Sequence, residues 1–313
     1  MKLLLTGGAG YIGGTAAHML LQQGFELNIL DDLSTGHAES VPKGANFFQG
    51  SLLDEQVVST ALRGCDAVMH FAAKSLVGES VEKPELYEKV NVGGSTMLFN
   101  KMRELDVRDL VFSSTAATYG EPKHIPITEE DPPEPTNPYG ATKLKIDQMI
   151  TEYGFNAISL RYFNVAGAYK SSAGWIQELH NPETHLIPNI LKATDKNPIK
   201  IFGTDWPTKD GTCIRDYVHV VDLIDAHIKA LNNLKSEKHE IINLGSGSGY
   251  SVREVIQTAA KVVGHEIPQV IGPRRSGDPA VLIAGIEKAK IVLDWQPKLN
   301  LEQMIRDSWS SMN

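Results

Sequence analysis

A tyrosine and a lysine stand four residues apart in the stretch "TNPYGATKLK", where Tyr139 follows Pro138 and precedes Lys143. Proline suits the first position of a helix, and the apolar residues that follow recur at helical spacing, so we predict a helix here. Residues four apart on a helix are neighbours, which puts the Lys143 ammonium beneath the Tyr139 ring. A cation and a helix N-terminus both favour the phenolate. The pair is therefore predicted to exchange protons with a sugar or alcohol hydroxyl near neutral pH.

A second pair has the same spacing. Tyr119 and Lys123 lie in the stretch "TYGEPK", with Gly120 and Pro122 between them. Glycine and proline disfavour a helix, so these two side chains need not share a face. We predict that this pair takes no part in the chemistry.

A hydroxyl residue ends another predicted element, in the stretch "FSSTAATYG". Thr115 follows a strand, and a side chain at the carboxyl end of a parallel strand points into the ligand crevice. It could hydrogen-bond a substrate oxygen or the Tyr139 phenol. On the strand alone, a solvated Ser/Thr turn is an equally good interpretation. The tyrosine–lysine pair and a glycine-rich loop elsewhere in the chain favour the catalytic one.

That glycine-rich loop, "GGAGYIG", lies between the first predicted strand and the first predicted helix. It satisfies both Gly8-x-Gly10-x-x-Gly13 and the looser Gly7-x-x-Gly10-x-x-Gly13. Small residues there let the backbone approach a pyrophosphate and aim the helix N-terminus at it. Because any turn from a strand to a helix can carry glycines, the pattern alone is weak. Its position in the chain is what indicates a dinucleotide.

Two acidic residues at the end of the second predicted strand, Asp31 and Asp32, complete this pattern. An acid at this position can hold the 2′-hydroxyl of a ribose. With no arginine close by in the sequence, the two carboxylates would repel a 2′-phosphate. We therefore expect NAD rather than NADP as the cofactor.

Strands and helices that position these residues alternate along the first half of the chain. This alternation implies parallel strands joined by right-handed crossovers. We predict an α/β fold, a doubly wound parallel sheet of Rossmann type with a smaller mixed α/β substrate domain. Strands are predicted at residues 2–6, 26–31, 45–50, 66–72, 109–114 and 157–164, and helices at residues 12–23, 53–62, 84–103 and 139–153.

The pattern becomes irregular after residue 164, which indicates a second lobe closing over the carboxyl edge of the sheet. We assign residues 1–165 to an NAD-binding domain and residues 166–313 mainly to a substrate domain. The stretch "EIINLG" (240–245) again looks like a buried strand. Segments near 210–250 are therefore expected to return to the first domain.

The composition and net charge limit the kinds of partner and the cellular location that the sequence predicts. The 313 residues are 42% hydrophobic and 22% charged, as in an ordinary globular protein, and the net charge of −8 disfavours a nucleic-acid partner. The start "MKLLLTGGAG" is too short an apolar run for a signal peptide, and no apolar stretch is long enough to predict a membrane span. Cys65 and Cys213 are spaced neither like a zinc pair nor like a disulfide framework. We expect a cytoplasmic protein without a metal site.

Together these features resemble the extended short-chain dehydrogenase/reductases and, within them, the family of UDP-glucose 4-epimerases. The resemblance rests on the Thr115, Tyr139 and Lys143 set and on segments in the family's order: "TGGAGYIG", "HFAAKSLVGESV", "NVGGS", "FSSTAATYGEP", "RYFNVAGA", "IFGTDWPTKDGTCIRDYVHVVDL" and "RRSGDPAVL". These segments span nearly the whole chain. The resemblance implies an isomerase with bound NAD that interconverts UDP-galactose and UDP-glucose. It also implies a homodimer, formed through the helices at 84–103 and 139–153.

Two sets of contacts are implied by this resemblance, position by position. The implied NAD contacts are Gly7, Gly10, Tyr11, Ile12, Gly13, Asp31, Asp32, Leu33, Ser34, Thr35, Gly36, Ser51, Leu52, Phe71, Ala72, Ala73, Lys74, Asn91, Thr115, Tyr139, Lys143 and Phe163. The implied UDP-sugar contacts are Thr115, Tyr139, Asn164, His185, Leu186, Lys200, Ile201, Phe202, Arg215, Arg275, Asp278 and Leu282.

Some of these assignments have chemical support, and others leave alternatives open. Arg215 and Arg275 suit a diphosphate, because guanidinium groups match phosphate oxygens. The Phe202 ring could line a pocket for uracil. His185 is equally well explained as a core or surface histidine, and Lys200 as a residue that lends only backbone atoms.

Three positions bear on specificity. Ser51 stands where family members commonly have aspartate, so the adenine contact is expected to differ. The catalytic hydroxyl is Thr115 where serine is also common, and the added methyl restricts its rotamers without changing the chemistry. Leu282 is implied to face the C2 substituent of the sugar. Its intermediate size predicts that hexoses are good substrates and N-acetylhexosamines slower ones.

The resulting hypothesis is that Tyr139 takes the proton of the sugar 4-hydroxyl while C4 gives a hydride to NAD. Lys143 would stabilise the phenolate and Thr115 would steady the shared proton. The 4-keto sugar would then turn its other face before the hydride returns, so that C4 is inverted.

Three other functions are alternatives to this one. A nucleotide-sugar 4,6-dehydratase needs an additional acid and base, and Ala116 and Ala117 stand where such residues would be. A 4-epimerase of a UDP-pentose or a UDP-N-acetylhexosamine is compatible with every motif. A non-catalytic NAD-binding regulator would not need the intact Thr115, Tyr139 and Lys143.

Overall fold

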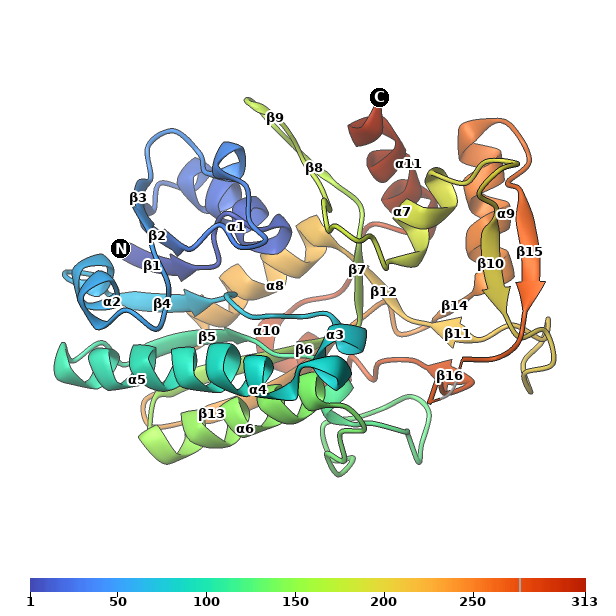
Figure 1. Ribbon diagram of the computed structural model, residues 1–313. Coiled ribbons are helices and arrows are strands. Elements are labelled where there is room, and N and C mark those ends of the chain that lie inside the picture. The colour runs from blue at the N-terminus through green and yellow to red at the C-terminus, as the bar shows by residue number, and fades with distance from the viewer. Residues whose placement is uncertain (276) are drawn as a thin grey trace.

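The computed structural model describes residues 1–275 and 277–313. Within these residues, the largest element is a seven-stranded sheet with the order β13-β6-β5-β4-β1-β2-β3, parallel at every pairing (Figure 1). Its order runs outward from β1 in both directions, which confirms the predicted doubly wound fold. The strands are β1 (Lys2–Thr6), β2 (Glu26–Asp31), β3 (Asn46–Gln49), β4 (Ala67–His70), β5 (Asp109–Ser113), β6 (Asn156–Tyr162) and β13 (His239–Leu244).

Helices cover both faces of this sheet. Successive residues of a strand point to opposite faces, so Leu3 and Leu5 of β1 pack into one core and Leu4 into another. Burial on both faces explains why the strands appear in the sequence as continuous apolar runs. The first core lies under α1 (Tyr11–Gln22), α8 (Val220–Asn232) and α10 (Glu287–Leu293), and the second under α2 (Glu55–Leu62), α5 (Gly94–Glu104) and α6 (Pro138–Tyr153).

The long helix predicted at 84–103 is not one regular α-helix. It consists of α4 (Pro84–Tyr87), a π-helical segment (Glu88–Gly93) and α5. Two consecutive glycines end the π-helical segment and begin α5, where they weaken the regular hydrogen-bond ladder. The short helix α3 (Val77–Glu82), just before it, was not predicted.

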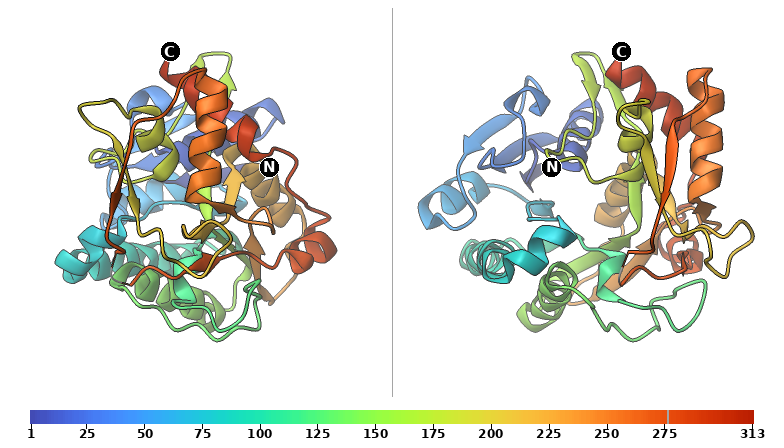
Figure 2. Two further views of the ribbon diagram at one scale, coloured as in Figure 1. Left: turned by 90° about the vertical axis from the view of Figure 1, so that its right-hand side faces the viewer. Right: turned by 45° about the vertical axis from the view of Figure 1, so that its right-hand side comes forward.

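The second lobe is built from short elements around a separate core (Figure 2). In Figure 2 the orange helix α9 and the red helix α11 stand together beside the sheet. The helices of this lobe are α7 (Leu186–Leu191), α9 (Val252–Val263) and α11 (Leu301–Met312). Its strands are β10 (Ile199–Phe202) paired with β15 (Gln269–Gly272), and β11 (Ile214–Arg215) between β14 (Tyr250–Ser251) and β16 (Val281–Leu282).

Two small ribbons connect the lobes. They pair β7 (Asn164–Ala166) with β12 (Tyr217–His219) and β8 (Tyr169–Ser171) with β9 (Gly174–Ile176).

Late segments of the chain return to the large sheet. The strand expected at 240–245 is β13, which pairs with β6 along its whole length. Helices α8 and α10 also pack against the sheet. The division at residue 165 stays a prediction, because the sheet takes segments from both sides of it. In the described part of the chain, every helix is too short or too polar to cross a bilayer.

Candidate active site

A large pocket lies at the carboxyl ends of β1, β2 and β4 and encloses about 1090 Å³, its open mouth included. Ligands of open α/β sheets bind at this edge. The pocket brings together most residues that the sequence predicted for a cofactor. Its lining includes Gly7, Gly10, Tyr11, Ile12, Gly13, Asp31, Asp32, Ser34, Thr35, Gly36, Ser51, Leu52, Phe71, Ala72, Ala73, Lys74, Tyr139 and Lys143.

The glycine-rich loop forms one wall of this pocket and leaves no room for side chains. Gly7 has a φ of +70°, and a Cβ there would lie 2.6 Å from the Ala72 nitrogen. A Cβ on Gly13 would lie 2.2 Å from the Gly7 carbonyl oxygen. The N-terminal amides of α1 have no side-chain cap in the described structure. This cradle therefore fits an anionic group such as a pyrophosphate.

Asp31 shapes the loop that follows β2. One carboxylate oxygen accepts a hydrogen bond from the Ala9 amide at 2.9 Å and the other accepts from the Leu33 amide at 2.9 Å. Burial raises the pKa of this carboxyl group above its ordinary value. Asp31 itself faces the pocket, whereas Leu33 lies beside the lining in a left-handed turn with φ of 58°.

Asn91 is also placed behind the lining. Its side chain accepts from the Lys74 amide at 2.8 Å and donates to the Lys74 carbonyl at 3.0 Å. This residue therefore holds the backbone after β4 in place, and the neighbouring Phe71 to Lys74 stretch forms the pocket wall. Phe163, another predicted contact, is buried in a small core with Tyr119.

The predicted catalytic residues converge at one end of the pocket. Pro138 opens α6 as predicted, and the Asn137 side chain caps it by accepting from the Gly140 amide at 2.9 Å. Tyr139 and Lys143 both line the pocket. Thr115 is not part of the lining, but it lies beside the Tyr139 phenol and lowers the pKa of that phenol. These contacts bring the Thr115 turn to the start of α6.

Lys143 is held from behind by the end of β5. Its ammonium donates to the Ser113 carbonyl at 2.8 Å and lies 4.7 Å from the centre of the Phe112 ring. The side chain is almost fully buried. A single backbone carbonyl and a ring face replace most of the water that an ammonium would have in solution.

The electrostatic expectation for this pair was wrong for the protein without a ligand. Burial raises the pKa of Tyr139 to about 12 and lowers the pKa of Lys143 to about 7. Both shifts have the same cause, because an apolar setting disfavours the phenolate and the ammonium alike. A half-neutral lysine cannot hold the phenol ionised. The phenolate would need a further positive charge in the pocket.

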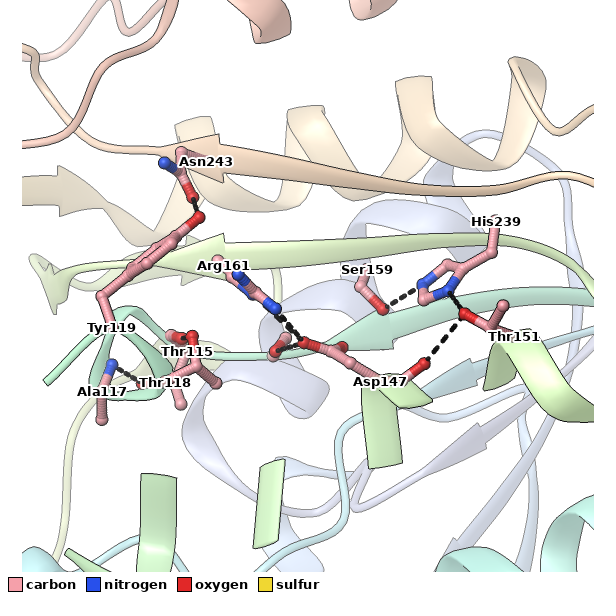
Figure 3. A network of polar contacts seen from close by, with 11 residues as sticks. Thr115, Ala117, Thr118, Tyr119, Asp147, Thr151, Ser159, Arg161, His239 and Asn243 are labelled. Atoms are coloured by element: carbon pink, nitrogen blue, oxygen red, sulfur yellow. Dashed lines mark hydrogen bonds and ion pairs between the residues drawn. The ribbon is translucent and has the colours of Figure 1, made fainter. Parts of the chain in front are cut away.

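A buried polar network fixes α6 against the sheet behind this site (Figure 3). Asp147, one turn after Lys143, accepts from the Arg161 guanidinium at 2.9 and 3.1 Å and from the Ser114 hydroxyl at 3.1 Å. The Arg161 and Asp147 side chains are only 3% and 2% exposed. His239 of β13 extends the network through hydrogen bonds to Thr151 and Ser159.

The second tyrosine–lysine pair does not face the pocket. Gly120 has a φ of +67°, so no helix joins Tyr119 to Lys123 in the described structure. The buried Tyr119 hydroxyl donates to the Asn243 side chain at 2.8 Å, and the Arg161 guanidinium lies 4.8 Å from its ring centre. Lys123 is exposed and pairs with Glu134 at 2.8 Å. Tyr119 therefore has a structural role.

Basic residues predicted to bind a diphosphate gather in the second lobe. The Arg275 guanidinium donates to Asp278 at 2.8 Å and lies 4.8 Å from the centre of the Phe202 ring. The ammonium of Lys200 lies 5.4 Å from the same ring. Arg215 lies 3.8 Å from the other Asp278 oxygen. Three predicted contacts, Arg275, Lys200 and Arg215, thus lie against Asp278 or the Phe202 ring.

Arg215 carries an unsatisfied hydrogen-bond donor in this cluster. Its Nη1 donates to the Ile214 and Pro279 carbonyls, both at 2.9 Å. Its Nη2 is buried and has no hydrogen-bond partner among residues 1–275 and 277–313. Buried donors are normally satisfied, so this guanidinium is suited to an incoming anion.

The remaining predicted substrate contacts have different surroundings. Ile201 is buried in the core of the second lobe, so it could contact a ligand only through its backbone, and Leu186 packs against the same core. Leu282 pairs with Arg215 across the β11–β16 ladder. The Asn164 amide donates to the Asp216 carbonyl at 2.8 Å. The His185 ring forms a hydrogen bond with the Glu183 carboxylate at 2.8 Å.

Several lining residues were not predicted. Tyr162 lies at the carboxyl end of β6 and shares a hydrogen bond with the Ser113 hydroxyl at 2.6 Å, and its position at a strand end could have identified it. Glu178 and His180 come from the irregular segment before α7, where no periodicity marks them. The other unpredicted lining residues are Leu30, Gly50, Leu53, Ser75 and Val90.

Known proteins resemble this chain along nearly its whole length. Residues 3–245 match the NAD dependent epimerase/dehydratase family. The chain is 52% identical to the UDP-glucose 4-epimerase of Corynebacterium glutamicum, over 99% of this chain and 95% of that protein. A crystal structure of UDP-glucose 4-epimerase shares 44% identity with a TM-score of 0.94, over 99% of this chain and 96% of that one. The UDP-glucose 4-epimerase from Brucella ovis in complex with NAD shares 39% identity with a TM-score of 0.94, over 99% and 97%.

Proposed function

This chain belongs to the NAD dependent epimerase/dehydratase family, and from that premise we propose that it interconverts UDP-glucose and UDP-galactose by inverting C4. The chain is an epimerase, and the proposed reaction makes it an isomerase. The observation that carries the proposal is that one pocket holds both the glycine cradle and the Tyr139–Lys143 pair. Similarity to UDP-glucose 4-epimerases over both lobes supports the substrate class.

NAD is the cofactor of this family, and the pocket residues fit it. The cradle from Gly7 to Gly13 would hold the pyrophosphate, and Asp31 would hold the adenine ribose. Bound NAD would supply the hydride chemistry, as acceptor for the hydride of the sugar C4 and as its donor when the hydride is returned. Tyr139 and Lys143 would flank the nicotinamide end of the pocket.

Residues of the chain itself would transfer the proton of the sugar 4-hydroxyl. Tyr139 would take the proton of the sugar 4-hydroxyl in the first half-reaction and return it in the second. Because its pKa is about 12 without a ligand, a positive charge in the pocket is needed to lower that pKa toward neutrality. Thr115 would steady the shared proton, and the Ser113 carbonyl would hold the Lys143 ammonium in reach.

The second lobe would hold the UDP group while the sugar turns. Arg215 and Arg275 are proposed to bind the diphosphate, with Asp278 aligning both guanidinium groups. An anchor on the nucleotide leaves the 4-keto sugar free to present either face. Because the nucleotide would be fixed and the sugar mobile, the same tyrosine could transfer the proton whichever face the sugar presents.

The decisive experiment is to incubate the protein with NAD and UDP-galactose and to resolve the products. We expect UDP-glucose, with no deuterium at C4 when the reaction runs in heavy water, because the hydride never leaves the protein. Deuterium at C4 would contradict the proposal, since proton abstraction without a redox step would explain it better. No turnover of any UDP-sugar would favour a non-catalytic NAD-binding protein.

A 4-epimerase of a UDP-N-acetylhexosamine is the second candidate, and Leu282 is the position that separates the two. An added N-acetyl group against a packed wall costs about 1–3 kcal/mol. Leu282→Tyr should lower kcat/KM for the N-acetylated pair far more than for the hexose pair, and Leu282→Ala should not. If the ratio of kcat/KM for the two substrate pairs is the same in the unchanged protein and in both variants, Leu282 does not line the sugar pocket.

We propose two further assignments. A homodimer formed through the helices at 84–103 and 139–153 is implied by the family resemblance. A cytoplasmic location is supported by the two free, buried thiols of Cys65 and Cys213.

A further inference from the structure

Three side chains before α7 form a group that no step of the proposed reaction uses. Glu178, His180 and His185 each place one possible ligand atom within 4.8 Å of the others. All three are partly buried. A carboxylate and two imidazoles are the donor set of many zinc sites, and they also suit neighbouring divalent transition metals.

Hydrogen bonds orient both imidazoles for binding. His180 bonds the Glu178 carboxylate through Nδ1, and His185 bonds Glu183 through Nδ1 at 2.8 Å. A carboxylate only accepts, so Nδ1 carries the proton in each contact. The Nε2 lone pair of His185 is therefore free, whereas an ion held by both Glu178 and His180 would take the place of the proton between them. A carboxylate behind a histidine is the arrangement that fixes metal-binding imidazoles in proteins.

Glu183 provides an observation that is independent of the three ligand atoms. Its side chain is only 8% exposed. Its Oε1 accepts from His185, whereas its buried Oε2 has no hydrogen-bond partner anywhere in the described chain. Burying a carboxylate is costly unless a positive charge lies close. A dication on the neighbouring imidazole would compensate it.

We propose that Glu178, His180 and His185 bind a divalent transition metal ion, with Zn²⁺ the best match, and that Glu183 positions His185 for it. Three protein ligands leave a fourth position for water. Because Glu178 and His180 line the cofactor pocket and His185 immediately precedes α7, the ion would tie the rim of that pocket to the second lobe. This departs from the sequence-based expectation of no metal site.

The test uses the full-length protein without an affinity tag, stripped with a chelator and titrated with Zn²⁺ against a chromophoric competitor. We expect one ion per chain with micromolar or tighter affinity. The double substitution His180→Gln and His185→Gln should weaken it by at least about 100-fold. His265→Gln, which removes an exposed histidine outside this group, is the matched control and should change nothing.

Three further measurements separate the loss of a ligand from the loss of folding. Glu183→Gln should weaken binding by about 10–100-fold, as expected for a residue that positions a ligand. Co²⁺ in place of Zn²⁺ should give intense visible bands of four-coordinate geometry, and these should disappear in Glu178→Gln. Melting temperatures of the metal-free variants show whether they fold. Zn²⁺ affinity that is only millimolar, or that survives the double substitution in a folded protein, would overturn the proposal.

Discussion

Two tyrosine–lysine pairs have identical spacing in the sequence but different surroundings in the folded protein. Tyr139 and Lys143 share one turn of α6 and both face the large pocket. Gly120, with its left-handed backbone, separates the other pair, so that Tyr119 is buried in a small core and Lys123 lies in solvent. Four-residue spacing therefore carries chemical meaning only where a helix holds both side chains and a cavity lies in front of them.

Charge alone does not distinguish the two tyrosines. A guanidinium lies over the Tyr119 ring, yet burial still raises the pKa of this phenol above its ordinary value. Arg161 is already paired with Asp147, and the Tyr119 hydroxyl is already bonded to Asn243. What makes Tyr139 available is its position against an open pocket, with Thr115 beside it.

The largest expected effect is on turnover. Tyr139→Phe should lower kcat with UDP-galactose by about 10²–10⁴-fold, because the phenol that moves the proton is lost. UDP binding, measured by calorimetry, should survive, since its proposed anchors lie in the other lobe. Turnover close to that of the unchanged protein would end the proposed role of this pair.

The next effect is on stability. Arg161→Met should lower the free energy of unfolding by about 3–5 kcal/mol, because Asp147 would keep a buried charge without its partner. Urea unfolding followed by circular dichroism measures this loss. Arg306→Met removes an exposed pair with Glu302 and is the control, expected to cost at most about 1 kcal/mol. Equal losses in the two variants would show that the network in Figure 3 adds little.

A smaller effect should appear in the dependence of stability on pH. The folded pKa of Lys143 is about 7, below the ordinary value of about 10.4, so the unfolded chain binds more protons between these limits. The free energy of unfolding should therefore rise with pH in that window. Relative to Lys143→Met, the protein without NAD should gain up to about 1.4 kcal/mol per pH unit. If the free energies of unfolding of the unchanged protein and of Lys143→Met vary with pH in parallel between pH 7 and 9, Lys143 is not desolvated.

The smallest effects belong to the second pair. Tyr119→Phe should leave kcat nearly unchanged and cost about 1–3 kcal/mol of stability, because the buried Asn243 oxygen loses its donor. Lys123→Ala should cost at most about 1 kcal/mol, as expected for an exposed ion pair. A large loss of kcat in either variant would mean that this pair also serves the reaction.

Much of the fold could be predicted because its signals are local. The strand at residues 26–31 and the helix start at Pro138 appear where the sequence placed them. The π-helical segment and α3 were missed, because both depend on packing rather than on periodicity. Most of the pocket lining was found through motifs, whereas Glu178 and His180 have no motif to mark them.

The sequence by itself determined which positions must lack a side chain, where a helix starts, and which side chains lie one helical turn apart. Each of these is encoded within a few neighbouring residues, as in the Gly7 to Gly13 loop and the start of α6. Tertiary structure alone decided the protonation of Tyr139 and Lys143, since pKa values respond to burial that remote segments impose. It also decided that Arg215 meets Asp278 and that β13 completes the sheet, because such contacts exist only once distant segments pack together.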